Sequence, residues 1–135
     1  MQMFEEWSQT FDDRMPIYRQ IILRFNRAFV RGDIHPGDRI PSIRELSALL
    51  RVNTNTIQRV YQEMERDGVI SSKRGTGYYF TEDSKMTEKI RKNLTSESVQ
   101  RFVDEMCALG LKEKEILDEL KAYLKGGESS ESDST

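Results

Sequence analysis

The sequence predicts a mostly helical protein with one small β-hairpin near the middle of its 135 residues. Two observations support this fold class. Apolar residues recur every three to four positions through most of the chain, as they do in amphipathic helices. Residues 69–81 break this pattern with two short β-prone runs around the glycine-containing stretch KRGTG, which is typical of a tight hairpin.

The first strong helical pattern begins at Pro16 and ends at Gly32. Proline is favoured in a first turn because the N–H group that it lacks would be unpaired there, and glycine is common just past a helix end. Pro36 and Gly37 then predict a turn. Ile34 and Ile40 flank this turn, and they are candidates for a very short strand.

Two further helices follow closely. Ser42 and Glu45 form the capping-box pattern at the start of the second helix. That helix breaks near residues 51–53, and the third helix runs on to Gly68. Its predicted buried face carries Ile57, Val60, Tyr61 and Met64.

The hairpin is predicted from Val69–Ser72 and Tyr78–Thr81, and residues 82–84 form a joint. Beyond the joint, apolar stripes predict two to three helices, with a new helix beginning near Ser96 or Ser98 and an interruption at Gly110. The last ten residues contain no apolar side chain, which predicts a disordered tail.

This order of elements is that of a winged helix-turn-helix followed by a short C-terminal segment of two to three helices. In that motif the second of the paired helices enters the major groove of DNA, and its N-terminal residues contact base edges. The predicted organisation is residues 1–14 as an N-terminal segment, 15–83 as the DNA-binding domain, 84–125 as a helical dimerisation segment and 126–135 as the tail.

Polar side chains gather where this motif would contact DNA. Asn, Thr and Gln can donate to and accept from base edges and phosphates, and Arg and Lys neutralise phosphates. Each group also has an explanation that does not involve DNA. Capping accounts for one or two polar residues of the third helix, and Arg44 could pair with an acid one turn further along its helix. The basic residues at the hairpin tip could simply be solvated. The candidate DNA-binding residues are Ser42, Arg44, Asn53, Thr54, Asn55, Thr56, Gln58, Arg59, Lys73, Arg74, Gly75, Thr76 and Gly77.

The charge distribution agrees mildly with a polyanionic partner. The chain has a net charge of −2, but residues 15–83 carry eleven Lys and Arg against eight acids. Residues 1–14 carry one Arg against four acids, and residues 84–135 carry nine Lys and Arg against eleven acids. The basic bias of residues 15–83 is mild, and alone it would be weak support for DNA binding.

At these residues the chain resembles the GntR family of bacterial transcription regulators. The resemblance is carried by PIYRQI and by RGDIHPGDRIPSIRELSALLRVNTNTIQRVYQEMERDGVISSKRGTGYYF, and it covers about residues 16–81. Ser47 stands where the family usually has alanine, a change between two small residues. Some branches carry guanine-reading arginines at the positions of Thr54 and Gln58, so a different operator is implied here.

The pattern is most similar to the YtrA-like branch of that family, which has a short C-terminal segment. The resemblance implies a sequence-specific DNA-binding regulator, acting as a homodimeric repressor on a palindromic operator, with a transporter operon as a common target. A protein-interaction module that has lost DNA binding is the alternative. The intact KRGTG tip and the polar head of the third helix argue against it.

The resemblance also implies that the C-terminal helices form the dimer. The sequence agrees, because these helices carry more apolar residues than two isolated helices could bury, and a symmetric partner would cover them. The alternative is that they cover the first helix of their own chain. Residues 84–125 are too few to enclose a typical ligand pocket of ~300–1,000 Å³, so a small-molecule effector stays unknown. The proposed dimerisation residues are Val99, Phe102, Val103, Met106, Ile116, Leu117, Leu120, Tyr123 and Leu124.

Three N-terminal aromatic residues, Phe4, Trp7 and Phe11, recur at helical spacing. We expect them to pack against the C-terminal helices of the same or the other subunit. A ligand cage formed by Trp7 and Phe11 is a less favoured alternative.

The sequence does not predict an enzyme, a metal site or a cofactor. His35 is the only histidine and lies in the Pro-Gly turn, while Cys107 falls in an apolar stripe and is expected in a core. The N-terminus has no signal-peptide pattern, and no apolar run approaches the ~18 residues of a membrane span, which predicts a cytoplasmic protein.

Overall fold

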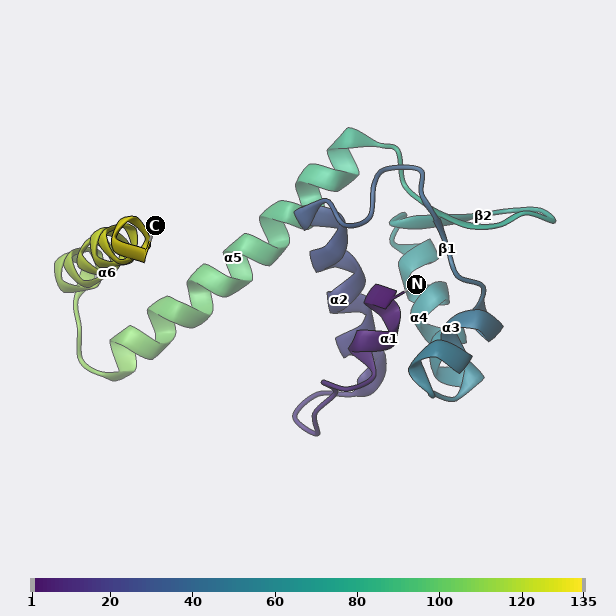
Figure 1. The fold of residues 1–135 in the computed structure, drawn as a ribbon, viewed down its shortest axis with the longest axis horizontal. Coiled ribbons are helices and arrows are strands. Elements are labelled where there is room, and N and C mark those ends of the chain that lie inside the picture. Colours follow the sequence, from purple (N-terminus) through teal and green to yellow (C-terminus); the bar gives the residue numbers. More distant parts are fainter. Residues whose placement is uncertain (1, 135) are drawn as a thin grey trace. The chain divides into compact units, whose positions relative to one another are not determined.

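The computed structural model describes the backbone of residues 2–134 and the side chains of residues 3–126. The chain divides into two compact units, Met1–Asn93 and Leu94–Thr135. The boundary therefore lies inside the fifth helix, further along the chain than residue 83. The elements in chain order are α1 Gln2–Trp7, α2 Ile17–Arg31, β1 Arg39–Ile40, α3 Ile43–Leu50, α4 Thr54–Arg66, β2 Ile70–Lys73, β3 Gly77–Phe80, α5 Ser84–Ala108 and α6 Glu113–Ser134 (Figure 1).

The expected boundaries of the first long helix are confirmed. Pro16 is the N-cap residue of α2, and Gly32 is its C-cap with φ of 94°. The Gly32 N–H donates to the carbonyl oxygens of Ala28 and Phe29. A left-handed glycine of this kind satisfies carbonyl groups that the last helical turn leaves unpaired.

The three strands form one antiparallel sheet in the order β1-β3-β2. Ile40 pairs with Tyr78 across β1 and β3, and Ile70 pairs with Phe80 across β2 and β3. Ile40 thus lies in a short strand as expected, whereas Ile34 is buried outside the sheet. The partner of β1 is the distant strand β3, so residues of the hairpin become neighbours of the segment that leads into α3.

The core of the first unit is an aromatic cluster centred on Phe25, whose side chain is fully buried. Its ring centroid lies 5.0 Å from that of Trp7, 5.7 Å from Phe4, 6.1 Å from Tyr61 and 6.0 Å from Phe80. Tilted and edge-on pairs at these separations stabilise a core beyond their buried area. Phe25 therefore joins α1, α2, α4 and β3 at one point.

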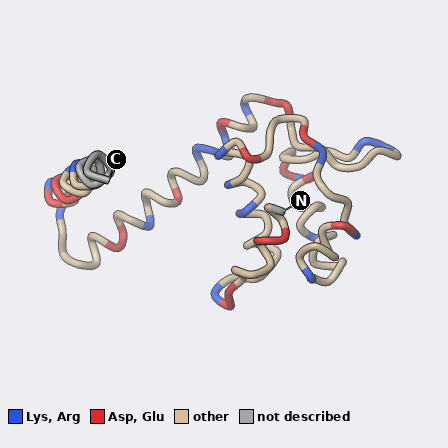
Figure 2. The backbone as a smooth tube through the Cα atoms, viewed as in Figure 1, with Lys and Arg blue, Asp and Glu red and all other residues tan. Residues whose placement is uncertain are grey.

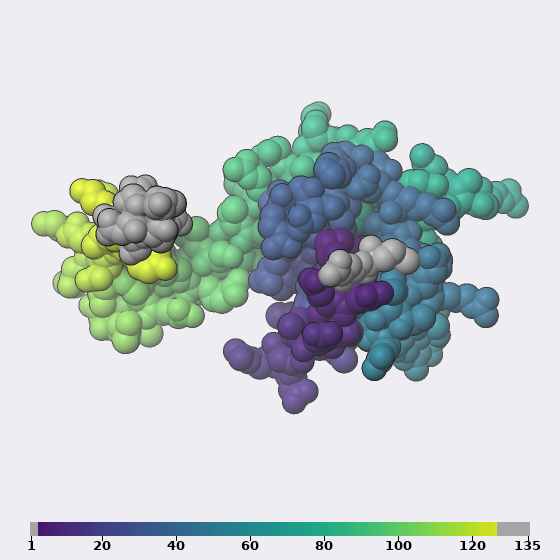
Figure 3. Space-filling view, viewed as in Figure 1, coloured from purple at the N-terminus to yellow at the C-terminus, as the bar shows by residue number. Residues whose placement is uncertain are grey.

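The N-terminal aromatic residues pack in the first unit, which corrects the expectation that they cover the C-terminal helices. Phe4 and Trp7 are buried against Phe25. α1 also contacts α3, and Figure 3 shows the purple N-terminal segment lying against the body of this unit. The aromatic spacing predicts the helix, but it cannot identify which apolar surface the helix covers.

Two polar side chains of α2 hold the segment between α1 and α2. Gln20, which is only 7% exposed, accepts a hydrogen bond from the Asp12 N–H and donates to the carbonyl oxygens of Asp12 and Met15. Arg24 donates to the carbonyl oxygens of Trp7 and Thr10. These bonds satisfy backbone groups that have no partner in a helix or strand.

The Phe11 ring is also held by α2, since the guanidinium carbon of Arg24 lies 4.7 Å from its centroid. Trp7 is enclosed by Phe4 and Phe25. Trp7 and Phe11 therefore have intramolecular partners, which does not support the ligand-cage alternative.

The C-terminal helices differ from the expectation in three respects. α5 is continuous through Ser96 and Ser98, because serine costs only a few tenths of a kcal/mol in a helix interior and does not stop one. The sequence predicts a disordered tail over residues 126–135, whereas α6 continues helically to Ser134, since extending an existing helix is far easier than starting one; Thr135 lies outside the described residues. Cys107 is exposed and not in a core.

The interruption between α5 and α6 lies where the sequence predicts it. Gly110 has φ of 89°, its N–H donates to the carbonyl oxygen of Cys107, and the Leu111 N–H donates to that of Met106. No helix in the described part of the chain is both long and apolar enough to cross a membrane.

A hydrogen bond in the core leads to a first prediction. The Tyr61 hydroxyl donates to the buried carbonyl oxygen of Pro41 at 2.5 Å. Tyr61→Phe keeps the ring but leaves this carbonyl unpaired, so we expect the free energy of unfolding to fall by about 1–3 kcal/mol. Urea denaturation at fixed protein concentration measures the loss. Tyr79→Phe is the control, because its hydroxyl is exposed and makes only a 3.4 Å contact, and an unchanged midpoint for Tyr61→Phe would contradict the prediction.

The same residue predicts a difference at high pH. Burial raises the pKa of the Tyr61 phenol well above its ordinary value. A raised pKa in the folded state stabilises the protein below the unfolded pKa of about 10, and this contribution is lost as the pH rises beyond it. Above that pH the wild type should lose stability more steeply than Tyr61→Phe, by about 1.4 kcal/mol per pH unit for one proton. Parallel denaturation curves at each pH check this, and equal slopes would show that Tyr61 ionises freely in the fold.

Candidate nucleic-acid interface

The start of α3 presents a capped helix end and an exposed arginine. The Ser42 hydroxyl accepts from the Glu45 N–H at 3.1 Å, and the Glu45 carboxylate accepts from the Ser42 N–H at 3.4 Å. This is the predicted capping box. Arg44 is exposed, and among the described side chains it has no ion pair or hydrogen bond, so the alternative in which it pairs with a nearby acid is not seen.

The turn between α3 and α4 is held by Ser47. Its hydroxyl donates to the Val52 carbonyl oxygen, and the Val52 N–H donates back to the Ser47 carbonyl oxygen at 3.1 Å. An alanine at position 47 could not make the first bond, so Ser47 does more than supply a small side chain. Arg51 has φ of 56° and is the one non-glycine residue with a positive φ in the described backbone.

The head of α4 separates into a cap and exposed polar residues. Asn53 is the N-cap residue, and its side-chain oxygen accepts from the Asn55 N–H at 2.8 Å. Capping therefore accounts for Asn53 alone. Thr54 and Asn55 are exposed, Thr56 is half-buried, and the structure gives their side chains no hydrogen bond within the described residues.

Gln58 and Arg59 lie on the outer face of α4, as expected, but they differ in their surroundings. Gln58 is exposed. The Arg59 guanidinium carbon lies 3.7 Å from the ring centroid of Tyr18 on α2, and its Nε lies 3.4 Å from a carboxylate oxygen of Glu63. Arg59 thus has two intramolecular partners, and Gln58 projects from the helix without one in the described part of the chain.

The wing consists of β2, β3 and the turn 74–76 between them. Within the turn, the Thr76 N–H and hydroxyl both donate to the Lys73 carbonyl oxygen. Gly75 and Gly77 have φ of 78° and 122°, which side chains rarely allow. Lys73 and Arg74 are exposed, and Figure 2 shows basic residues at the outer end of the wing.

The three groups of candidate residues lie on adjoining elements of the first unit (Figure 1). α3 contacts α4, α4 contacts β2, and β1 runs directly into α3 while it pairs with β3. The Tyr61 hydroxyl, on α4, holds the Pro41 carbonyl between β1 and α3. Helix, turn and wing are therefore fixed to one another through the core.

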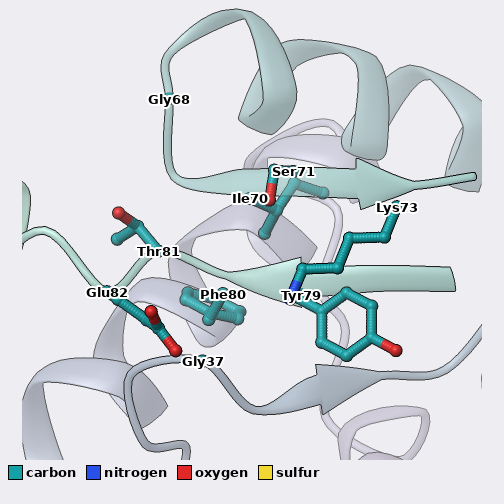
Figure 4. Close-up of a pocket in the computed structure, with 9 residues that line it drawn as sticks. All are labelled: Gly37, Gly68, Ile70, Ser71, Lys73, Tyr79, Phe80, Thr81 and Glu82. Atoms are coloured by element: carbon teal, nitrogen blue, oxygen red, sulfur yellow. The ribbon is translucent and has the colours of Figure 1, made fainter. Parts of the chain in front are cut away.

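A cavity of about 170 Å³ opens beside the wing (Figure 4). It is smaller than the ~300–1,000 Å³ of most organic-ligand sites. Figure 4 shows the Lys73 side chain running over the Tyr79 ring at its edge. The lining residues are Gly37, Gly68, Ile70, Ser71, Lys73, Tyr79, Phe80, Thr81 and Glu82.

The predicted dimerisation residues differ in exposure within the single chain. Ile116 is buried, whereas Phe102, Val103 and Met106 are half-buried. The others have side chains that are 38–77% exposed: Val99, Leu117, Leu120, Tyr123 and Leu124. Val99 and Val103 line an open groove of about 500 Å³ on α5, together with polar neighbours.

Two residues of the candidate nucleic-acid interface are not predicted from the sequence. Ser47 anchors the helix-turn-helix turn, and Arg39 lies on β1 beside Tyr79 of the wing. The apolar Ile40 after Arg39 suggests alternation in a strand, which would turn Arg39 outward. The pairing of β1 with β3 joins residues far apart in sequence, so no local pattern indicates it.

The exposed candidate residues of this region carry amide, hydroxyl and cationic groups. The described residues include no group of three His, Cys, Asp or Glu side chains that could hold a metal ion. Exposed amide, hydroxyl and cationic groups instead match base edges and phosphates.

Comparison with known proteins agrees with this geometry. Residues 17–80 match the family model described as bacterial regulatory proteins, gntR family. The chain is 39% identical to the uncharacterised HTH-type transcriptional regulator YhcF of Bacillus subtilis, over 87% of this chain and 97% of that protein. It is 33% identical to the HTH-type transcriptional repressor YtrA of the same organism, over 86% and 92% respectively.

A solved structure shows the same fold. It is the GntR family transcriptional regulator from Listeria monocytogenes, with a TM-score of 0.77 and 38% identity, over 83% of this chain and 98% of that one. These matches extend well beyond the winged helix, so they include much of the C-terminal helices. The protein therefore belongs to the gntR family of bacterial transcription regulators, which are not enzymes, and its relatives include regulators of the YtrA type.

Proposed function

We propose that the protein is a homodimeric repressor that binds a palindromic operator. In this proposal, residues 15–83 contact DNA and residues 84–125 form the dimer. The exposed head of α4 carries the argument: Asn53 alone caps the helix, which leaves Thr54, Asn55 and Gln58 exposed for base edges. Amide side chains suit adenine, and a threonine methyl suits thymine.

Phosphate contacts would come from the cationic residues around that head. Arg44, Lys73 and Arg74 are exposed and have no ion pair among the described residues. Gly75 leaves the backbone at the tip of the wing accessible, since a Cβ atom there would meet nothing within 4 Å. Arg59 has a secondary place in the proposal, since its guanidinium already stacks on Tyr18.

The dimer is supported by the apolar surface of the C-terminal helices. Leu117, Tyr123 and Leu124 are 46%, 77% and 55% exposed in the single chain. A second copy would remove this surface from water, at about 25 cal/mol per Å² of apolar area. A two-fold dimer would place two copies of α4 on half-sites about one helical turn of DNA, ~34–36 Å, or a multiple of it apart.

Repression is proposed from the relative YtrA, whose name describes a transcriptional repressor. The resemblance to that branch also favours an operon that encodes a transporter. Sequencing of genomic fragments retained by the purified protein would identify the operator and the adjacent genes. Retained fragments without a common palindrome would count against the proposal.

The proposal predicts a division of roles within α4. Asn55→Ala and Gln58→Ala should each relax base preference at a defined operator position, at about 1–3 kcal/mol per lost contact. Asn53→Ala should instead destabilise the helix by about 0.5–2 kcal/mol and leave base preference unchanged, because it removes a cap. Binding-site selection with each variant, together with thermal melting, separates the two effects.

Arg66→Ala is the matched control for those variants, since Arg66 is exposed in the last turn of the same helix and pairs only with its neighbour Asp67. It should keep the wild-type preference. If Asn55→Ala and Gln58→Ala both selected the wild-type operator with unchanged affinity, the head of α4 would not be the reading element.

The dimer leads to a separate prediction. Leu117→Asp should convert the protein to a monomer, because a buried unpaired carboxylate is costly in an apolar interface. Light scattering coupled to size exclusion measures the mass. Leu109→Asp is the control: Leu109 is 75% exposed and lies outside the proposed set, so this variant should stay dimeric. A monomeric wild type at micromolar concentration would refute the proposed assembly.

A further inference from the structure

Arg39 is an exposed cation on the solvent-facing side of the sheet. In β1 its neighbour Ile40 is only 3% exposed and faces the core, so the alternation of a strand turns Arg39 outward. Arg39 pairs with Tyr79 of β3. Gly77 lies two residues before Tyr79 and therefore on the same face of the sheet.

The Arg39 side chain runs along the sheet toward the tip of the wing. A Cβ atom built on Gly77 would lie 3.0 Å from Nε, 3.5 Å from Nη2 and 3.6 Å from Cζ of Arg39. Cζ is the farthest of the three atoms, so the guanidinium turns its Nε–Nη2 edge, and not a face, toward the open space above Gly77. A side chain at position 77 would push it away, and φ of 122° at this residue is also unfavourable to side chains.

Positive charge is concentrated on this side of the wing. Lys73 pairs with Gly77 on the other side of β3, and its Nζ lies 4.5 Å from the ring centroid of Tyr79. Arg74 follows Lys73 in the turn. We call Arg39, Lys73 and Arg74 the basic wing strip, and within the described residues none of the three has an ion pair.

The nearby acids have other contacts. Asp38 accepts from the His35 N–H at 2.8 Å, and Glu65 accepts from the Ser72 hydroxyl at 2.7 Å. Glu82 lies at the opposite end of β3, against Gly37. The basic wing strip is therefore not neutralised by the fold, as a polyanion-binding surface requires.

Arg39 also occupies a fixed place between the wing and α3. Only Ile40 and Pro41 separate it from Ser42, the capping residue of α3, and the Tyr61 hydroxyl holds Pro41. We propose that Arg39 binds a backbone phosphate of DNA between the contacts of the wing and those of Arg44. This inference rests on the proposed DNA binding and assigns a contact that neither the sequence motif nor the turn of the wing includes.

The geometry suits a phosphate and not a base. The exposed guanidinium has fork-shaped pairs of N–H groups, and one such pair can donate two parallel hydrogen bonds to phosphate oxygens. The space that Gly77 leaves by having no Cβ accommodates the long side chain along the sheet, where it points toward the wing. A phosphate contact fixes position on the duplex and carries no sequence information.

The test measures affinity by fluorescence anisotropy at several KCl concentrations, with the full chain. Its two probes are a duplex from binding-site selection and an unrelated duplex of equal length. Arg39→Gln should weaken both complexes by about tenfold, because it removes a charged hydrogen bond. The slope of log affinity against log salt should become shallower by about 1 for each subunit engaged.

Two further variants distinguish contact from general damage. Arg39→Lys keeps the charge but not the planar fork, so it should restore the salt slope and only part of the affinity. Arg31→Gln is the matched control, because Arg31 is exposed at the end of α2 and pairs with Asp33 at 2.7 Å; it should bind as the wild type does. Thermal melting confirms that each variant is folded.

The outcomes distinguish a failure of the Arg39 contact from a failure of the proposed DNA binding. If Arg39→Gln matches the wild type in affinity and salt slope while Arg44→Ala binds weakly, the Arg39 contact is wrong and the DNA-binding proposal stands. If Arg39→Gln changes base preference without changing the slope, Arg39 reads a base and the phosphate assignment fails. If the wild type binds neither duplex at any salt concentration, both proposals fail.

Discussion

The hydrogen bond from the Tyr61 hydroxyl to the Pro41 carbonyl is the constraint on which the arrangement of α3, α4 and the wing depends. Tyr61 lies midway along α4, and Pro41 is the residue between β1 and the cap of α3. One bond in an apolar core therefore connects the helix that carries the polar head, the helix that carries Arg44 and the strand that flanks the wing. Because an unpaired carbonyl is costly there, these elements keep one relative position.

The aromatic cluster around Phe25 holds the Tyr61 ring in the position from which its hydroxyl makes that bond. Tyr61 packs against Phe25 and Tyr78, and Phe4 and Trp7 close the cluster on its N-terminal side. Gln20 and Arg24 then hold the connecting backbone. The N-terminal segment is consequently part of the folded first unit. Its removal would expose the ring of Phe25, which packs directly against Tyr61 of α4.

Local signals in the sequence predict those features that depend on neighbouring residues. Pro16, Gly32, Ser42 and the periodicity of α4 mark helices because capping and amphipathicity act within a few positions. Tertiary choices are not visible in this way: the N-terminal aromatic residues need burial, but nothing local says against which surface. The pairing of β1 with β3 and the stacking of Arg59 on Tyr18 are likewise set by packing between distant residues. At Ser96 and Ser98 a local signal misleads: serine favours helix caps, which predicts a new helix there, but it is also tolerated inside a helix, and α5 continues through both residues.

Gly77 has a consequence for how such a regulator can diversify. Its φ of 122° strains any side chain, and a side chain there would also displace the guanidinium of Arg39, so this end of β3 offers few acceptable substitutions. Thr54, Asn55 and Gln58 are exposed on a helix whose buried face is held separately, so they can vary at little cost to stability. In the proposed mode of DNA binding, a change of operator would therefore come from substitutions in the head of α4, while position 77 of the wing stays a glycine.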